Sequence, residues 1–152
     1  MRKHYDALWG IVTSEMKHDV LSGDRFCFIN KLDRTGADFF RCVQMMQDRL
    51  NSNTAVLQIP IGNEADFIGV VDLVEMWALT WRGETTIGDD YTIEAIPANL
   101  VEQAAEYREK LLETLADVDD DIAEAFLEGD DIPVATLKAA IRRATLADKI
   151  NP

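Results

Sequence analysis

Basic residues, cysteines and long apolar runs are all scarce in this sequence, and each shortage excludes a class of protein. The 152 residues include 28 Asp and Glu against 15 Lys and Arg, which gives a formal net charge of −13. Binding to nucleic acid needs clustered Lys and Arg that displace counterions from phosphates, so free nucleic acid is not an expected partner. No stretch approaches the roughly 18 apolar residues of a membrane span, and no signal-peptide pattern is present. We therefore expect a cytoplasmic protein without a membrane partner.

The chain also has few residues suited to metal or nucleophilic chemistry, with only two cysteines and two histidines. Cys27 and Cys42 lie in apolar segments without C-x-x-C spacing, which argues against a disulfide framework and against a zinc site. His4 and His18 have no metal-ligand spacing and are expected to be ordinary surface or core residues. We therefore assign no metal site and no catalytic residue.

The first part of the chain is expected to contain two amphipathic helices on either side of one buried strand. Apolar residues recur at three- and four-residue steps from Tyr5 to Val20, which predicts a helix that ends near Gly23. The continuous apolar run from Phe26 to Ile29 is typical of a strand buried on both faces of a parallel sheet. A second helix is predicted over residues 37–50. Its expected inward-facing stripe consists of Phe39, Val43, Met46 and Leu50.

Short strands are predicted in the middle of the chain, followed by helices. The strand-like runs are Thr54 to Ile59, Gly69 to Trp81 and Tyr91 to Ile96, with a turn region at residues 83–88. Two tryptophans in the middle run, Trp77 and Trp81, are expected to pack on one face of a sheet. This order indicates an α/β fold class, with α+β character in the later part of the chain.

Three helices are expected after Pro97, which suits the first turn of a helix. Gly129 suits the position just past a helix end, and Pro133 suits the opening of the last helix. The acidic run at residues 119–121 is expected to cap a helix N-terminus, because it lacks the regular oxygen ligands and glycine turn of a calcium loop.

The tetrapeptide Asn30-Lys31-Leu32-Asp33 follows the predicted buried strand, where ligands bind in open α/β sheets. N-K-x-D is the pattern with which GTP-binding proteins read guanine. The Asp33 carboxylate could accept hydrogen bonds from the guanine ring nitrogen and exocyclic amine, while the Asn30 amide reaches the other edge. The Lys31 stem could pack along the base plane. Adenine lacks those two donors, so the carboxylate would select guanine.

This motif is not accompanied by the other parts of a GTPase. Three specified residues match by chance in about one chain of this length in fifty, so the tetrapeptide alone is only suggestive. No glycine is followed by lysine, which excludes the phosphate-binding loop G-x-x-x-x-G-K-[ST], and no Ser-Ala dipeptide completes the base pocket. The phosphate-sensing pattern D-x-x-G occurs at residues 33–36 and 66–69, and we interpret both as chance matches.

Longer stretches around the motif resemble bacterial translation elongation factor G, a family of translational GTPases. The run from Phe26 to Phe40 is similar to the base-reading segment of that family, and the similarity continues to Pro152 without a large gap. The further similar segments are Gln58-Ile59-Pro60-Ile61-Gly62, Phe67 to Leu73, Glu106-Tyr107-Arg108-Glu109-Lys110-Leu111, Leu127-Glu128-Gly129 and Leu137 to Thr145. Residues 1–24 do not match the family.

The resemblance implies a division of the chain into four parts. Residues 1–24 form an unmatched leader helix, and residues 25–54 form part of a P-loop-type G domain with the base-reading motif. Residues 55–146 correspond to the G-prime subdomain, with a small mixed or antiparallel sheet and helices, and residues 147–152 begin a G-domain strand. The chain is therefore expected to be a fragment or truncated relative of the family. A strand without its usual neighbours exposes its edges, which favours dimerisation or strand exchange.

The predicted helix from Ala98 to Val118 has one strongly acidic side. Helical spacing places its apolar residues on a broad arc: Val101, Ala104, Ala105, Leu111, Leu112, Leu115 and Val118. The opposite stripe, without an interleaved basic residue, consists of Glu102, Glu106, Glu109, Glu113 and Asp117. One interpretation is a solvated face, and the other is a docking surface for a basic protein. The resemblance favours docking, because it implies that the first four glutamates contact the lysine-presenting carboxyl-terminal domain of the ribosomal stalk protein.

The family couples GTP hydrolysis, with Mg²⁺, to movement of transfer RNA and messenger RNA through the ribosome. The resemblance therefore implies a guanine-binding role for Asn30, Lys31 and Asp33. Without a phosphate loop and switch segments, this chain is expected to be inactive alone and to hold no GTP, GDP or Mg²⁺. The alternative is a stand-alone acidic interaction module that does not bind nucleotides.

Overall fold

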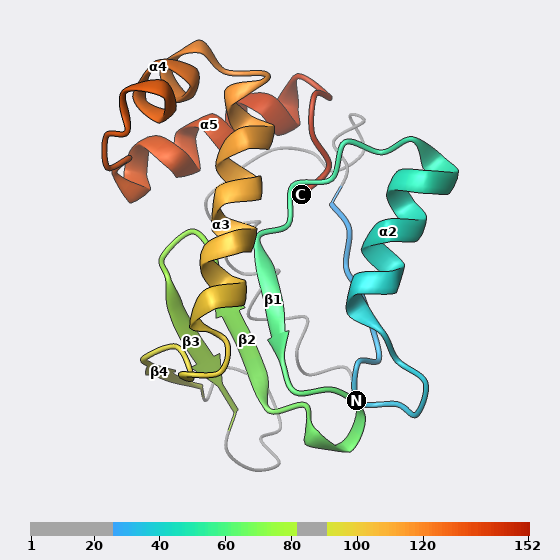
Figure 1. The fold of residues 1–152 in the computed structure, drawn as a ribbon. Coiled ribbons are helices and arrows are strands. Elements are labelled where there is room, and N and C mark those ends of the chain that lie inside the picture. Colours follow the sequence, from blue (N-terminus) through green and yellow to red (C-terminus); the bar gives the residue numbers. More distant parts are fainter. Residues whose placement is uncertain (1–25, 82–90) are drawn as a thin grey trace.

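The structure is a computed structural model that describes residues 26–81 and 91–152 (Figure 1). The described elements, in chain order, are α2 (Phe39–Leu50), β1 (Gln58–Ile61), the short 3-10 helix η2 (Glu64–Asp66), β2 (Gly69–Asp72), β3 (Trp77–Thr80), β4 (Thr92–Glu94), α3 (Val101–Ala116), α4 (Asp120–Glu128) and α5 (Val134–Leu146). The leader helix predicted from Tyr5 to Val20, both histidines and the turn region at 83–88 lie outside the described residues. These helices and strands confirm the predicted fold class.

The four strands form one antiparallel sheet in the order β1-β2-β3-β4, as expected for the later part of the chain. Buried residues alternate with less buried ones along the first three strands. Ile59 pairs with Val71, and Val71 pairs with Ala78, so these three buried side chains lie on one face. Trp77 and Trp81 are both half-buried, which agrees with a packing role.

The run from Gly69 to Trp81 is a hairpin, and its prediction as a single strand was wrong. The Asp72 carboxylate accepts hydrogen bonds from the backbone N–H groups of Val74 at 2.8 Å and Glu75 at 2.9 Å. Met76 has a φ of 59° and donates its N–H to the Asp72 carbonyl. An aspartate that bonds to the following backbone groups starts a turn, and this local effect outweighs the continuous apolar pattern.

All three helices predicted after Pro97 are present. The first was predicted from Ala98 to Val118 but runs from Val101 to Ala116, so Pro97 precedes it rather than lying in its first turn. Gly129 ends α4 in the left-handed conformation with a φ of 74°, and Pro133 immediately precedes α5. Helix α3 lies along the sheet, while α4 and α5 lie beyond the end of the sheet at the β2–β3 turn (Figure 1). The apolar arc predicted for α3 is too broad, because Val101 and Ala105 are exposed.

Two basic side chains connect the helices to the β2–β3 turn. The Arg108 guanidinium on α3 donates to the carbonyls of Leu73 at 2.6 Å and Val74 at 2.9 Å. Burial lowers the pKa of this guanidinium from its ordinary value. Lys138 on α5 lies 2.6 Å from the Glu75 carboxylate. These contacts fix α3 and α5 against the same end of the sheet.

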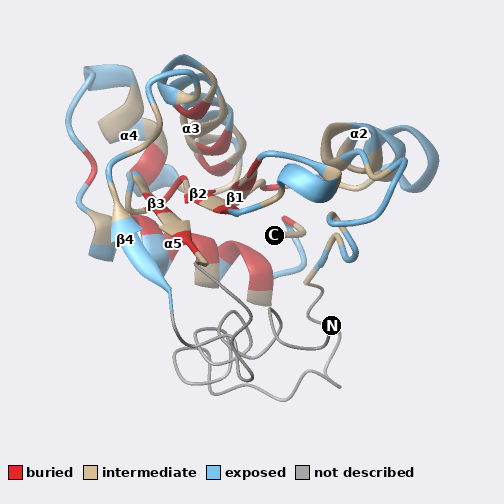
Figure 2. Ribbon diagram, turned by 90° about the horizontal axis from the view of Figure 1, so that it is seen from below, coloured by how far each residue is buried: buried red, intermediate tan, exposed pale blue. Residues whose placement is uncertain are grey.

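Among the described residues, the fully buried large side chains all lie between Ile59 and Ile150, and helix α2 contributes none (Figure 2). The inward stripe predicted for α2 was therefore wrong in part. Leu50 is 72% exposed, while Phe39, Val43 and Met46 are only half-buried. Helix α2 stands beside the sheet rather than over it (Figure 1), so the described sheet does not cover its apolar stripe.

The segment from Phe26 to Ile29 is extended but forms no strand, so the predicted doubly buried strand was wrong. Cys27 and Phe28 are exposed, and Phe26 and Ile29 are half-buried. The described four-stranded sheet does not extend to this segment, so it is not covered on both faces as a central strand would be. The two cysteines form no disulfide, and no helix within the described residues is long and apolar enough to cross a bilayer.

Candidate functional site

Three segments that are distant in sequence meet next to the N-K-x-D motif. The backbone N–H of Asn151 donates to the Asn53 carbonyl at 2.8 Å, and its carbonyl accepts from the N–H of Ala55 at 3.0 Å. The next residue, Pro152, accepts a hydrogen bond from the N–H of Cys27 at 2.8 Å. The last residues therefore connect the segment before the motif to the chain that enters β1.

The base-reading loop, residues 30–36, leads from this junction to helix α2. Lys31 has a left-handed φ of 63°, and its carbonyl accepts a hydrogen bond from the N–H of Arg34 at 3.1 Å, which closes a tight turn. Asn30, Lys31 and Asp33 are all exposed. Their side chains make no hydrogen bond or ion pair within the described parts of the chain, so they are available to a ligand.

Glu64, in η2 between β1 and β2, holds the base-reading loop in place. Its backbone N–H donates to the Leu32 carbonyl at 2.9 Å, and its carboxylate accepts from the N–H of Gly36 at 2.7 Å. One residue therefore satisfies a carbonyl near the middle of the loop and an amide near its end. The sequence patterns did not identify Glu64, because nothing local to it indicates a contact with residues 28 or more positions away.

The turn that presents Glu64 requires glycine at position 62. Gly62 has a φ of 80°, and a Cβ atom there would lie 2.0 Å from the Asp66 carbonyl oxygen. Any side chain would therefore clash with backbone as well as strain the left-handed conformation. Glu64 itself has a positive φ of 51°, which costs conformational energy that its two contacts help to offset. In the sequence, Gly62 was the residue that could have indicated a turn with a left-handed backbone conformation at this point.

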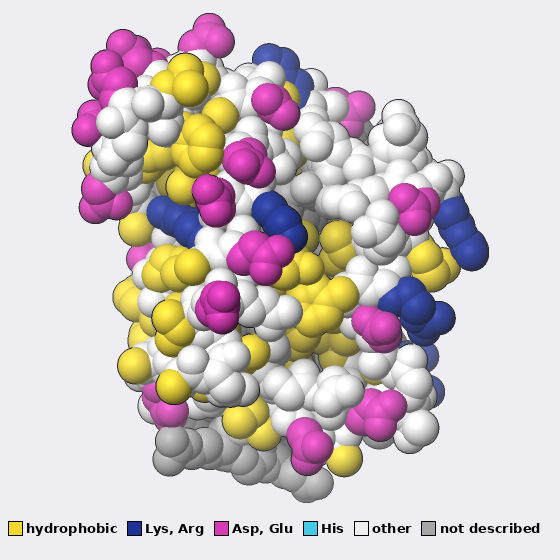
Figure 3. Space-filling model, in the orientation of Figure 1, with side chains coloured by type: hydrophobic (Ala, Val, Ile, Leu, Met, Phe, Trp, Pro, Cys, Tyr) yellow, Lys and Arg dark blue, Asp and Glu magenta, His cyan; other side chains and the backbone are white. Residues whose placement is uncertain are grey.

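The acidic side of α3 is exposed as predicted. Glu102, Glu106, Glu109, Glu113 and Asp117 are all accessible to solvent, and acidic side chains are prominent around this part of the surface (Figure 3). The expectation that no base offsets them was wrong, because Lys110 forms an ion pair with Glu106. Lys110 is four residues after Glu106, so it reaches back along the helix surface although it lies off the acidic stripe.

The ion pair changes the electrostatics at the centre of α3. The hydrogen bond to Glu106 is the main reason why the pKa of Lys110 is raised. The Lys110 ammonium also lies 4.8 Å from the centre of the Tyr107 ring. Partial burial raises the pKa of the Tyr107 hydroxyl, and the positive charge of Lys110 opposes this shift. The other acidic residues of this face have no such basic partner within the described residues, so they supply its unpaired negative charge: Glu102, Glu109, Glu113 and Asp117.

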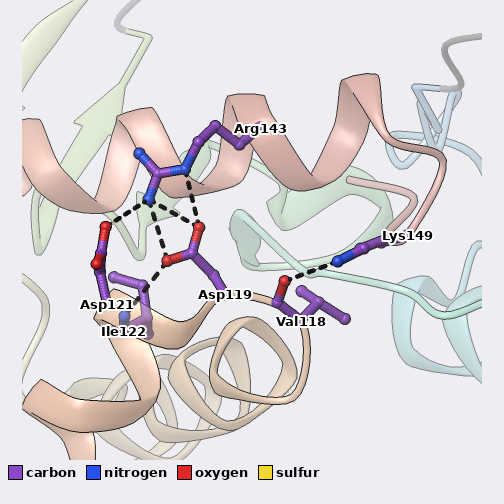
Figure 4. Close-up of polar contacts among 6 residues, drawn as sticks. All are labelled: Val118, Asp119, Asp121, Ile122, Arg143 and Lys149. Carbon is purple, nitrogen blue, oxygen red and sulfur yellow. Dashed lines mark hydrogen bonds and ion pairs between the residues drawn. The ribbon is translucent and has the colours of Figure 1, made fainter.

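The acidic run at residues 119–121 has the structural role predicted from the sequence. The Asp119 carboxylate accepts from the N–H of Ile122 at 3.4 Å and so caps α4. The Arg143 guanidinium on α5 forks around the same carboxylate, with contacts of 2.7 and 3.0 Å, and reaches Asp121 at 3.3 Å (Figure 4). These aspartates therefore join α4 to α5, and we do not assign them to a ligand site. Within residues 26–81 and 91–152, no group of three or more His, Cys, Asp or Glu could hold a metal ion.

Replacing the cap residue should destabilise the protein measurably. Asp119→Ala removes the helix cap and the partner of Arg143, so we expect the free energy of unfolding to fall by about 1–2 kcal/mol. The matched control is Asp120→Ala, which removes an equal charge from an exposed neighbour and should cost no more than about 0.5 kcal/mol. Urea denaturation of both variants measures the difference. An equal fall in the free energy of unfolding of both variants would show that the loss of one negative charge, rather than of the helix cap and the Arg143 contact, causes the destabilisation.

Removing the Glu64 carboxylate should loosen the base-reading loop. In Glu64→Ala, the Gly36 amide loses its acceptor, so its hydrogen exchange should become about tenfold faster. Asp66→Ala is the matched control, because it removes an exposed carboxylate from the same short helix. Exchange measured by NMR, at equal global stability, checks this. If Gly36 exchanges at the wild-type rate in Glu64→Ala, the carboxylate does not hold the loop.

No protein-family model matches the sequence. Among solved structures, the chain is similar in fold to the crystal structure of a protein from Thermus thermophilus, designated ttk003000868, with a TM-score of 0.71 and 18% sequence identity. The similarity covers 96% of this chain but 20% of that one, so this chain spans about a fifth of the length of the protein that it matches. At this identity, the comparison establishes a shared fold.

Proposed function

We propose that this chain is a segment of a cytoplasmic translational GTPase of the elongation factor G type. In this proposal, residues 30–36 supply one wall of the guanine pocket, and residues 55–146 are the G-prime insert. The observation that supports it most is the base-reading loop itself. Its N-K-x-D side chains are exposed and make no hydrogen bond or ion pair within the described residues, while Glu64 bonds to the loop backbone at Leu32 and Gly36. A loop anchored in this way loses little entropy when it binds a base.

The proposed chemistry at this loop is recognition of the base without hydrolysis. The Asp33 carboxylate accepts from the two adjacent N–H groups of guanine, Asn30 bonds the opposite edge, and the Lys31 stem covers one face. The residues present therefore suit the guanine base of GTP or GDP. They do not suit its phosphates or Mg²⁺, because the sequence has no phosphate loop to bind them. The full GTPase reaction, coupled to ribosomal translocation, belongs to the parent family in this proposal.

The acidic face of α3 is the second functional surface in the proposal. Its exposed glutamates would attract a lysine-rich domain, and the carboxyl-terminal domain of the ribosomal stalk protein is the partner that the family resemblance implies. The ten acidic and two basic residues between positions 98 and 128 concentrate negative charge in this part of the sequence. A stand-alone acidic interaction module would use the same surface without the nucleotide, and the two tests below separate these functions.

Base selectivity can be measured with nucleosides, which avoid the missing phosphate contacts. At micromolar concentration, GDP and ATP should both fail to bind detectably, because phosphate and Mg²⁺ contacts supply most of the affinity in this class of site. At millimolar concentration, guanosine should shift the backbone NMR signals of residues 30–36, and adenosine should not. Asp33→Asn replaces an acceptor by a donor, so it should abolish the guanosine shifts and favour xanthosine, which has a carbonyl in place of the exocyclic amine.

Two results would contradict guanine reading. One is an equal response of the loop to guanosine and adenosine, and the other is a guanosine response that persists unchanged in Asp33→Asn. Either result, together with intact binding to the stalk domain, would favour the acidic interaction module.

Charge reversal on α3 tests the docking surface. The double variant Glu106→Lys and Glu109→Lys should bind the isolated stalk carboxyl-terminal domain at least about tenfold more weakly at low salt, because like charges then face each other. The difference should shrink as salt rises. A control with Glu124→Lys and Glu128→Lys makes the same charge change at exposed residues of the neighbouring helix α4 and should keep most of the affinity. Equal weakening by both pairs would mean that total charge, rather than the α3 face, controls binding.

A further inference from the structure

Two segments that meet at the candidate site each contain a residue with a backbone conformation that is rare outside glycine. Lys31 has a φ of 63° and Glu64 has a φ of 51°, and the Glu64 N–H donates to the carbonyl of Leu32, the residue after Lys31. A left-handed residue other than glycine costs conformational energy and persists only where its surroundings support it. The other described non-glycine residues with positive φ lie at helix ends or in the β2–β3 turn, where such a residue is common: Asn51, Met76 and Asp148.

The two contacts of Glu64 lie on either side of Asp33 in the sequence. Its N–H bonds to the Leu32 carbonyl at 2.9 Å, and its carboxylate accepts from the Gly36 N–H at 2.7 Å. Both partners are backbone atoms, so Glu64 acts on the course of the chain through the N-K-x-D motif rather than on the motif side chains. Glu64 is half-buried, whereas Asp66 in the same short helix is exposed, so water weakens the Glu64 contacts less.

The β1–β2 connection, residues 62–68, holds Glu64 independently of the base-reading loop. The Ile68 N–H donates to the Ile61 carbonyl at 3.0 Å, which closes the connection where it joins the sheet. The Ile68 carbonyl accepts from the N–H of Trp81, the residue after β3, also at 3.0 Å. Glu64 is therefore anchored through this connection to β1 and to the end of β3.

We propose that Glu64 is a positioning residue for guanine recognition and couples the β1–β2 connection to the base-reading loop. Its contacts keep Lys31 in the left-handed conformation and hold the backbone on both sides of Asp33, so the motif has its base-binding form before the base arrives. This inference rests on the proposed function, because it concerns the same guanine base. It goes further by giving a role in recognition to a residue outside the motif.

The coupling must act in both directions. If the two contacts of Glu64 favour the loop conformation that binds guanine, then bound guanine strengthens these contacts by an equal factor. The β1–β2 connection therefore responds to whether the guanine pocket is filled.

Three variants test the positioning role by titration with guanosine, followed through the backbone NMR signals of residues 30–36. Glu64→Ala removes the acceptor for the Gly36 N–H and should weaken guanosine binding at least about fivefold. Glu64→Gln keeps a side-chain oxygen that can accept the same hydrogen bond, so its affinity should stay within about twofold of the wild type. Asp66→Ala removes an exposed carboxylate from the same short helix and should also stay within about twofold. Circular dichroism confirms that all three variants are folded.

Hydrogen exchange of the wild-type protein tests the coupling without any substitution. At a guanosine concentration that saturates the shifts of residues 30–36, exchange of the Glu64 N–H should become about fivefold slower, because the bound loop holds its acceptor at Leu32. Exchange of the Ala123 N–H, which bonds to Asp119 at the start of α4, should not change. Adenosine should leave both rates unchanged.

The inference is overturned if Glu64→Ala binds guanosine as tightly as the wild type, if Glu64→Gln loses as much affinity as Glu64→Ala, or if guanosine leaves exchange of the Glu64 N–H unchanged. In each of these cases the selective response of the wild type to guanosine would stand, so the proposed function would survive. An equal response of the wild type to guanosine and adenosine would instead contradict the proposed function and this inference together.

Discussion

The arrangement of the candidate sites depends on the backbone pairing of Asn151 and Pro152 with segments that lie far away in the sequence. Asn151 bonds on both sides of Thr54, and Pro152 bonds Cys27, so the end of α5 is brought back beside the start of β1 and the approach to the base-reading loop. This contact brings together the two ends of the segment that contains the buried core, from Ala55 to Ile150. It also sets the base-reading loop next to the β1–β2 connection, where Glu64 can bond to it.

The negative charge of the chain serves several distinct purposes in this structure. The carboxylates of Asp72 and Asp119 are bonded to backbone N–H groups and shape a turn and a helix end. Glu64 uses its charge to hold a loop. The glutamates on the outer side of α3 remain accessible to solvent, apart from the ion pair of Glu106. An acidic net charge alone therefore does not identify a docking surface, because several of these carboxylates are engaged within the protein itself.

The sequence predicted elements whose signals are local, and it failed where distant segments decide the outcome. Gly129 and Asp119 marked helix ends correctly, because caps depend on residues within one turn. The apolar run at residues 26–29 was assigned to a buried strand, but hydrophobic pattern does not specify which segments will cover it. Glu64 was missed for the same reason, since its importance comes from contacts with Leu32 and Gly36 across the fold. The N-K-x-D residues could be named as candidates from their motif, whereas only the structure shows that they are exposed.

The central claim is that the base-reading loop recognises guanine. Intermolecular nuclear Overhauser effects between millimolar guanosine and the chain test it most directly, because they report which side chains lie next to the base. The account predicts contacts between the proton on the imidazole-ring carbon of guanine and the methylene protons of Lys31, and none with the methyl groups of Val43 on helix α2. Guanosine contacts confined to residues outside 30–36, or equal contacts from adenosine at Lys31, would contradict it.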